Sequence, residues 1–334
     1  MTMVVIETNT VDINENLLNK IDASILRTLL KDQTTKKNII WATDYYVKYD
    51  PSFTFDSPIF VSSITGKYGD IIKPRVIKTE EEKQERCREK GEVFTPSWIC
   101  NQQNNMIYKD WFKNDNPFNV EDLENKTWHT KYESIVFSKE HNWKEYINQT
   151  NLEITCGEAP YLTSRYDTVT GFFIPVKDRI GLLDRKLRVI SENIKDKKEW
   201  FDYALKALKS TYGYEWQGDN LLLARENLLF TIIEHYACYF KTDLSKEQIE
   251  LLSEVISWNI WQMDGLRFVI PNSCSKEKEE TDLFGTSIVQ EKCYACSAND
   301  TKNHYFEHNG IYCKIKDWSE LEGGKIIRFV DILK

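Results

Sequence analysis

The sequence predicts an α/β fold built around a parallel β-sheet. Short strand-like segments, each followed by a polar turn, alternate with stretches of helical periodicity, and this alternation is typical of parallel sheets. The three strand-turn units are residues Asn151–Pro160, Ser210–Trp216 and Met263–Asn272. In such folds ligands bind at the carboxyl ends of the strands, so we expect the loops after Ile154, Tyr214 and Ile270 to meet in one crevice.

The remaining elements follow from local patterns along the chain. Apolar residues at helical spacing predict a helix from about Ile180 to Ser210 and another over Leu221–Phe240. A third helix is expected over Ser245–Trp258, with Glu247 as partner in a capping box opened by Leu244 or Ser245. Before them, the sequence predicts a short strand at Ile39–Thr43, an exposed charged helix at Thr79–Lys90, and a helix that Pro96 starts and that runs toward Trp111.

Composition and charge exclude several classes of protein. Hydrophobic residues make up 41% and charged residues 29% of the 334 residues, which argues against disorder or a fibrous repeat. No run of 18 apolar residues predicts a transmembrane helix, and the amino terminus lacks the pattern of a secretory signal, so we expect a cytoplasmic protein without membrane contact.

The net charge of −8 gives no globally basic surface for nucleic acid. The segment Lys177–Lys209 has a local balance of +4, which is also typical of a solvated helix face.

Small and acidic residues stand at the predicted strand ends. Gly157 lies in the turn after the first strand, where its lack of a side chain lets a ligand approach the backbone, although an ordinary strand-to-helix corner uses glycine too. Glu215 ends the second strand, where a carboxylate can accept hydrogen bonds from the ribose hydroxyls of a nucleotide-type cofactor. Asp264, in the third loop, is suited to accept a hydrogen bond from an adenine amino group.

Four segments together resemble a known family. They are GEVFTP (Gly91–Pro96), LEITCGEAPYL (Leu152–Leu162), YGYEWQGDNLLLARENLL (Tyr212–Leu229) and NIWQMDGLRFVIPN (Asn259–Asn272). In this order they are similar to S-adenosylmethionine-dependent DNA adenine methyltransferases, in particular the modification subunits of restriction systems. The resemblance covers about residues 91–272. It implies a Rossmann-like methyltransferase fold, with a mixed, mostly parallel sheet and helices on both faces.

The resemblance also implies which residues bind S-adenosylmethionine. The first segment would close over the methionine end of the cofactor, and the glycine loop would face its amino-acid part. Glu215 would bind the ribose hydroxyls. Trp216 would stack beside the adenine, and Asp264 would accept a hydrogen bond from the adenine amino group. The implied cofactor-binding residues are Phe94, Thr95, Pro96, Glu153, Cys156, Gly157, Ala159, Glu215, Trp216 and Asp264.

The sequence departs from this family at two places. The second glycine of the loop is Ala159, followed by Pro160, so the turn is stiffer. The family's catalytic tetrad of Asn or Asp, two prolines and an aromatic residue is absent, since the chain contains no Pro-Pro pair. That tetrad holds the target amine toward the methyl group while its aromatic ring stacks on the flipped base. Pro271 and Asn272 stand at the expected place and are our candidate catalytic residues.

Two other segments are weaker candidates for contacts with substrate. Asn116-Pro117-Phe118 is an alternative catalytic segment, although it precedes the glycine loop. Arg165 and Asp167 follow that loop and would suit a substrate phosphate or base edge, but the same pair is typical of a helix start with its own ion pair.

The last quarter of the chain predicts a zinc site. The spacing C-x18-C-x2-C-x16-C is formed by Cys274, Cys293, Cys296 and Cys313. A Cys-x2-Cys pair can supply two thiolate ligands to one tetrahedral metal ion. His308 is the replacement ligand, and the alternative is a set of unrelated thiols in a loop. Asn309-Gly310 within Glu307–Cys313 predicts a hairpin turn.

These observations divide the chain into three regions and give two functional hypotheses. The regions are a mixed region at 1–90, a methyltransferase-like domain at 91–272 and a zinc-binding β module at 273–334. The first hypothesis is an S-adenosylmethionine-dependent DNA adenine-N6 methyltransferase of a restriction-modification or defence system. The second is a catalytically inactive relative that binds DNA or a partner protein, and a methyltransferase for a different substrate is a further option. Double-stranded DNA and a separate specificity or restriction subunit are the expected partners.

Overall fold

The central element of the computed structural model is a small parallel β-sheet. Its strands are β3 (Asn151–Glu153), β4 (Thr211–Glu215) and β5 (Ile260–Gln262), in the order β3-β4-β5. Glu153 pairs with Gly213, and Glu215 pairs with Gln262, so the carboxyl ends of the three strands lie at one edge. The predicted parallel α/β arrangement is confirmed. The third strand is Ile260–Gln262 rather than part of Met263–Asn272, and the latter segment forms turns and isolated bridges.

The structure describes residues 11–13, 15–112, 116–137, 140–274, 277–282, 285–290, 292–298, 304–319 and 323–334. Residues 1–10, which carry our argument on a secretory signal, lie outside the described residues. None of the described helices is long and apolar enough to cross a membrane.

Four helices connect the strands of the sheet. Between β3 and β4 lie α6 (Leu182–Asn193) and α7 (Lys197–Lys209), and between β4 and β5 lie α8 (Gly218–Phe240) and α9 (Lys246–Asn259). The single helix predicted for this first connection is therefore two helices, because the Asp196 side chain accepts a hydrogen bond from the Glu199 N–H and starts α7 afresh. The capping box of α9 is formed by Ser245 and Gln248, one residue beyond the predicted Glu247.

The segments before the sheet pack against its helices. Here α1 (Glu15–Leu29) lies against α9, and α2 (Glu80–Lys90) begins at Thr79 with a complete capping box, as the charged segment predicts. Pro96 is the N-cap of α3 (Ser97–Ile107), which is followed by α4 (Lys109–Phe112). The smaller elements are a hairpin of β1 (Asn119–Asp122) and β2 (Thr127–Thr130), helix α5 (Trp143–Ile147), and the 3₁₀ turns η1 (Tyr45–Lys48), η2 (Val61–Ser63), η3 (Gly66–Tyr68), η4 (Arg75–Ile77), η5 (Val176–Asp178) and η6 (Phe329–Leu333).

The predicted strand at Ile39–Thr43 is an extended segment without strand pairing in the sheet. The Gln262 side chain takes the place of a pairing strand, since its Oε1 accepts from the Ile40 N–H at 2.9 Å and its Nε2 donates to the Ile40 carbonyl at 2.8 Å. On its other side, Ile40 forms a single antiparallel bridge with Pro58. The segment is thereby held beside the carboxyl end of β5.

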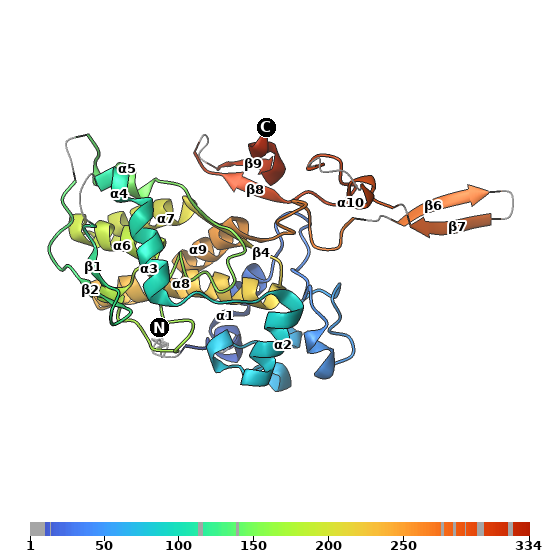
Figure 1. Cartoon of the computed structure of the whole chain (residues 1–334), viewed down its shortest axis with the longest axis horizontal. Helices are drawn as coiled ribbons and strands as arrows, with labels where there is room; N and C mark the ends of the chain where they lie inside the picture. The colour runs from blue at the N-terminus through green and yellow to red at the C-terminus, as the bar shows by residue number, and fades with distance from the viewer. Residues whose placement is uncertain are drawn as a thin grey trace.

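The carboxyl-terminal residues add β structure on one side of the body. The antiparallel pair β6 (Glu277–Asp282) and β7 (Gly285–Gln290) extends away from the rest of the molecule, whereas α10 (Tyr294–Ser297) lies near its base (Figure 1). A second antiparallel pair, β8 (Lys314–Asp317) and β9 (Lys325–Arg328), lies closer to the body. Ile315 of β8 and Phe329, which directly follows β9, share a hydrophobic cluster with Tyr214 and Trp261 of the sheet. A larger cluster, formed by helices α1 and α6–α9 with the 39–72 segment, makes up the main core.

Candidate cofactor cavity and metal cluster

A cavity of about 410 Å³ lies at the carboxyl ends of β3 and β4. It is lined by the 91–95 segment, by the loop after β3 and by the loop between β4 and α8. Its volume is within the range of small-molecule sites. Seven of the residues that the sequence predicts for the cofactor line this one cavity: Phe94, Thr95, Glu153, Cys156, Gly157, Glu215 and Trp216.

The loop after β3 turns through left-handed backbone conformations. Thr155, Gly157 and Ala159 have φ values of 45°, 55° and 62°. A Cβ on Gly157 would lie 3.3 Å from the ring of Phe94, so glycine permits both the turn and the close approach of the 91–95 segment. Ala159 adopts its positive φ at the cost that an L-residue bears there, and it is fully buried.

Two buried carboxylates lie at the strand ends beside the cavity. Glu215 accepts hydrogen bonds from the backbone N–H of Gly157 at 2.9 Å and of Gln217 at 3.1 Å, and thereby ties the two loops together. Glu153 accepts from the backbone N–H groups of Tyr161 and Leu162 at 3.4 and 3.1 Å. In the described part of the chain no basic side chain pairs with either carboxylate.

Burial raises the pKa of both acids. Loss of solvation is the largest cause for Glu153, whose pKa rises to about 8 although two backbone N–H groups lower it, and the Glu215 charge adds a smaller increase. The pKa of Glu215 is also raised, chiefly by burial, against the effect of the N–H groups of Gln217 and Gly157. Such carboxyls can accept hydrogen bonds from hydroxyl groups and favour a cationic ligand, because a nearby positive charge restores their ionised form.

Three other predicted cofactor residues do not line the cavity. Pro96 caps α3, and Ala159 is buried behind the loop. The predicted adenine reader, Asp264, closes its own turn: its Oδ1 accepts from the N–H groups of Leu266 and Arg267 at 2.9 and 3.1 Å, and its Oδ2 lies 3.3 Å from Arg267 Nη1. The structure thus gives Asp264 a local role in the loop after β5.

The predicted catalytic residues are also absent from the cavity lining. Asn272 has a left-handed backbone with φ 58°, and its Nδ2 donates to Asp56 Oδ1 at 3.0 Å. Pro271 precedes it in the same turn. The alternative segment is structural, since Asn116 Nδ2 donates to the Asn119 side chain and carbonyl.

The other polar candidates near the glycine loop have structural roles. Arg165 is buried and forms an ion pair with Glu234 at 2.8 Å, within a network that also includes Arg179. Asp167 accepts from the Ser97 N–H at 2.7 Å and holds the start of α3. The ion pair expected within this segment does not form, because Arg165 pairs with Glu234 of α8 and Asp167 binds the backbone at the start of α3, and the segment itself lies outside the described helices.

Three cysteines and one histidine converge in the carboxyl-terminal region. The ligand atoms of Cys274, Cys293, Cys296 and His308 all lie within 4.8 Å of one another. His308 Nδ1 lies 3.7 Å from Cys274 Sγ and 3.5 Å from the Sγ atoms of Cys293 and Cys296. Tetrahedral zinc, with bonds of about 2.3 Å to sulfur and about 2.0–2.1 Å to nitrogen, places such atoms roughly 3.5–3.6 Å apart. This Cys₃His cluster has the donor set and the spacing to bind a metal such as zinc.

The fourth ligand position belongs to His308 rather than to the predicted Cys313. Cys313 is fully buried, its N–H bonds to the Phe268 carbonyl at 3.0 Å, and its thiol donates to the Gln262 carbonyl at 3.3 Å. Backbone pairing just before β8 thus turns its side chain into the protein. Among the described residues, no pair of strands flanks Asn309-Gly310, so the predicted hairpin is not found there. Gly310 instead lies close to the metal cluster, because a Cβ at this position would lie only 3.0 Å from Cys274 Sγ.

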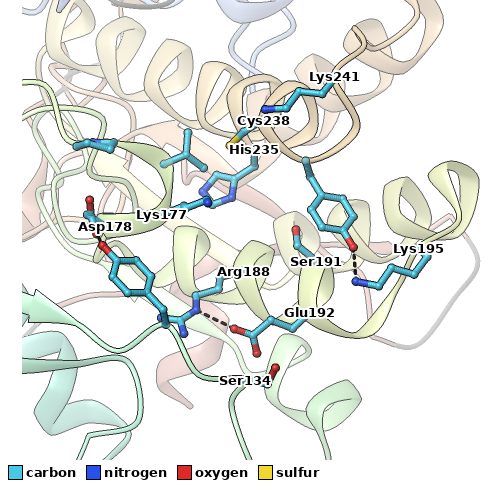
Figure 2. A pocket seen from close by; sticks show the side chains of 14 residues that line it. Ser134, Lys177, Asp178, Arg188, Ser191, Glu192, Lys195, His235, Cys238 and Lys241 are labelled. Atoms are coloured by element: carbon cyan, nitrogen blue, oxygen red, sulfur yellow. Dashed lines mark hydrogen bonds and ion pairs between the residues drawn. The ribbon is translucent and has the colours of Figure 1, made fainter.

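A second, larger cavity of about 1070 Å³ lies between the ends of α6 and α8 (Figure 2). It contains part of the basic segment, but several charges are committed to internal contacts. Lys195 Nζ donates to the Tyr239 hydroxyl at 2.6 Å, and Arg188 pairs with Glu192 at 2.8 Å, as the dashed lines in Figure 2 show. The solvated helix face expected for the basic segment is found only in part: Lys195, Lys197 and Lys198 are exposed, whereas Arg179, Arg185 and Lys186 are buried.

No family model, curated protein or solved structure matches this chain. The roles of the cavity residues therefore rest on their own contacts. Several lining residues carry no signal that singles them out in the sequence: Glu92, Val93, Ile154, Gln217 and Asn220. Glu92 and Asn220 are recognisable only in three dimensions, because their side chains bond to each other at 3.2 Å across 128 positions of sequence.

Proposed function

We propose that the chain is an S-adenosylmethionine-dependent DNA methyltransferase acting on adenine N6 in a restriction-modification or defence setting. The observation that carries the proposal is the convergence of seven residues, from three separate segments of resemblance, on one cavity at the carboxyl ends of parallel strands. This is the edge where ligands bind in open α/β sheets.

The chemistry of the cavity supports this cofactor. S-adenosylmethionine carries a cationic ammonium group and a sulfonium, together with ribose hydroxyls, and these groups suit the buried carboxyls of Glu153 and Glu215. The ring of Trp216 is held beside the cavity, since its Nε1 donates to the Ala42 carbonyl at 3.3 Å, and offers a face for a purine. Phe94 lies against Gly157 and shields that side from water. When bound, the cofactor would supply an activated methyl group.

In this proposal the chain's own residues bind and orient, and no covalent enzyme intermediate is needed. The exocyclic amine of adenine is itself the nucleophile, and duplex DNA must present it by base flipping. Pro271 and Asn272 remain the proposed contacts to that amine. A separate specificity subunit is part of the proposal, because a target-recognition region of its own needs a sizeable extra domain.

One observation favours a second candidate function, a catalytically inactive subunit that binds DNA or a partner protein. The Asn272 amide bonds to Asp56, neither Asn272 nor Pro271 lines the cavity, and the chain has no Pro-Pro pair. Such a subunit would keep the cofactor cavity without transferring a methyl group.

Calorimetric titration with S-adenosylmethionine and S-adenosylhomocysteine, followed by measurement of N6-methyladenine in DNA from expressing cells, tests both candidates. We expect micromolar binding that weakens by about 10- to 100-fold in Glu215→Ala, as loss of hydrogen bonds to a charged group predicts. Glu247→Ala, an exposed acid on α9, is the matched control and should bind normally. Binding with methylation supports the enzyme, and binding without methylation supports the inactive subunit. A folded protein that binds neither compound refutes the cofactor proposal.

A further inference from the structure

Gln217 occupies the N-cap position of α8 but does not cap the helix. N-cap residues are usually Ser, Thr, Asp or Asn, whose short side chains accept hydrogen bonds from the first N–H groups. Gln217 makes no such bond. The residue lines the cavity beside Trp216, at the carboxyl end of β4.

Other groups hold the start of α8 in its place. The Gly218 N–H donates to the Trp41 carbonyl at 3.0 Å. A Cβ on Gly218 would lie 2.1 Å from the Ile40 carbonyl oxygen, so glycine is required for this approach. The Gln217 N–H donates to Glu215 Oε1 at 3.1 Å. The helix start is therefore held without the Gln217 side chain, which leaves that side chain available to a ligand.

The amide oxygen of Gln217 has no hydrogen-bond partner in the described part of the chain. The residue is only 4% exposed, so this oxygen is buried, and a buried unsatisfied acceptor costs about 1–3 kcal/mol. Among the buried acids of the cavity, Glu153 and Glu215 accept from backbone N–H groups. Glu92 Oε2 pairs with Arg86 at 2.6 Å, and its Oε1 lies 3.7 Å from Arg75 Nη1. The unsatisfied oxygen thus points to a donor that a ligand brings.

We propose that Gln217 recognises the 6-amino group of the cofactor's adenine, the task that the sequence assigned to Asp264. Its Oε1 would accept from the amino group while its Nε2 donates to a ring nitrogen, the two-bond pairing by which glutamine reads adenine. Trp216 next to it supplies the stacking face. The inference rests on the proposed S-adenosylmethionine site, and it identifies Gln217 as a specificity-determining residue of that site.

Titration of the full chain with two compounds tests this role: S-adenosylhomocysteine, and its analogue whose purine lacks the 6-amino group. The wild-type protein should bind the amino compound about 5- to 100-fold more tightly, which is the discrimination of one good base contact. Gln217→Met, which keeps the shape of the side chain without its polar atoms, should bind both compounds with similar affinity. Gln149→Met is the matched control, since Gln149 does not line the cavity, and should keep the wild-type preference.

The outcomes separate the two levels of the proposal. Wild-type protein that binds both compounds equally, or a Gln217→Met protein that keeps the preference, overturns the role of Gln217 while the cofactor site stands. Equal binding of the two compounds by wild-type protein needs no variant, so this outcome overturns the role of Gln217 even where Gln217→Met does not fold. Binding of neither compound to the folded wild type overturns the cofactor site, and the role of Gln217 with it.

Discussion

Replacing Glu153 by Gln should change how the stability of the protein depends on pH. Burial, opposed by backbone N–H groups and aided by the Glu215 charge, raises the pKa of Glu153 from 4.5 to about 8. Below pH 4.5 both the folded and the unfolded chain carry the proton. Between pH 4.5 and 8 the unfolded chain releases it while the folded chain retains it, so this carboxyl progressively destabilises the fold as pH rises, and the effect levels off above pH 8.

The size of the effect follows from the same two pKa values. Each pH unit between them is worth about 1.4 kcal/mol, less near pH 8 where the folded carboxyl itself ionises. From pH 6 to pH 8 the free energy of unfolding of wild-type protein should therefore fall by about 2 kcal/mol relative to Glu153→Gln. The absolute stability of the variant also changes, because an amide offers one acceptor where the carboxyl offers two to Tyr161 and Leu162. The change with pH, rather than the offset, is therefore the quantity to compare.

Urea unfolding followed by tryptophan fluorescence at pH 6, 7 and 8 measures it. Glu254→Gln, at an exposed position on α9, should follow the wild-type pH dependence. If wild type and Glu153→Gln lose stability in parallel across this range, Glu153 is not held protonated in the folded protein, and the account of the cavity as a site of buried acids fails.

Two further predictions concern the metal cluster and the glycine loop. The purified chain should contain about one zinc ion, which Cys293→Ser should remove and Cys313→Ser should retain, because a hydroxyl can make the hydrogen bond of the buried thiol. Elemental analysis decides this, and metal loss in both variants would return Cys313 to the ligand set. Gly157→Ala should destabilise the fold by about 1–2 kcal/mol, since it forces an L-residue to positive φ, and should weaken cofactor binding by displacing Phe94. Gly323→Ala, where an added Cβ meets nothing within 4 Å, is the control, and equal thermal stability of the two variants would contradict the strain argument.

The sequence predicts well those features that local residues determine. Helices α6 to α9 follow from apolar spacing and turn signals, and strands β3 and β4 from strand-like segments that end in polar turns. The ends of those two strands locate the cavity residues, because parallel strands must bring their carboxyl ends together. The third strand is displaced because the apolar run after Asp264 is folded into turns. Phe268 and Asn272 there adopt left-handed backbone conformations, with φ values of 61° and 58°. An apolar sequence pattern does not predict such conformations at residues other than glycine.

Features that depend on distant contacts escaped prediction. Ile39–Thr43 has the composition of a strand, but its partner is the side chain of Gln262, 222 positions away in the sequence. The Cys-x2-Cys pair is local and was identified, whereas the choice between His308 and Cys313 is made by the backbone pairing of Cys313 with Phe268. Asn309-Gly310 has the composition of a hairpin turn, but its glycine is needed for the approach to Cys274.

The outer side of β5 determines how the small sheet behaves toward other chains. The Met263 N–H bonds to the Glu215 carbonyl of β4, so the alternation of the strand turns the carbonyls of Ile260 and Gln262 outward. Arg225 Nε donates to the first at 2.8 Å, and the thiol of Cys313 donates to the second at 3.3 Å. Exposed carbonyls on an edge strand are a template for aggregation. Here two side chains close that template, so β5 does not offer these carbonyls to a strand of a neighbouring molecule.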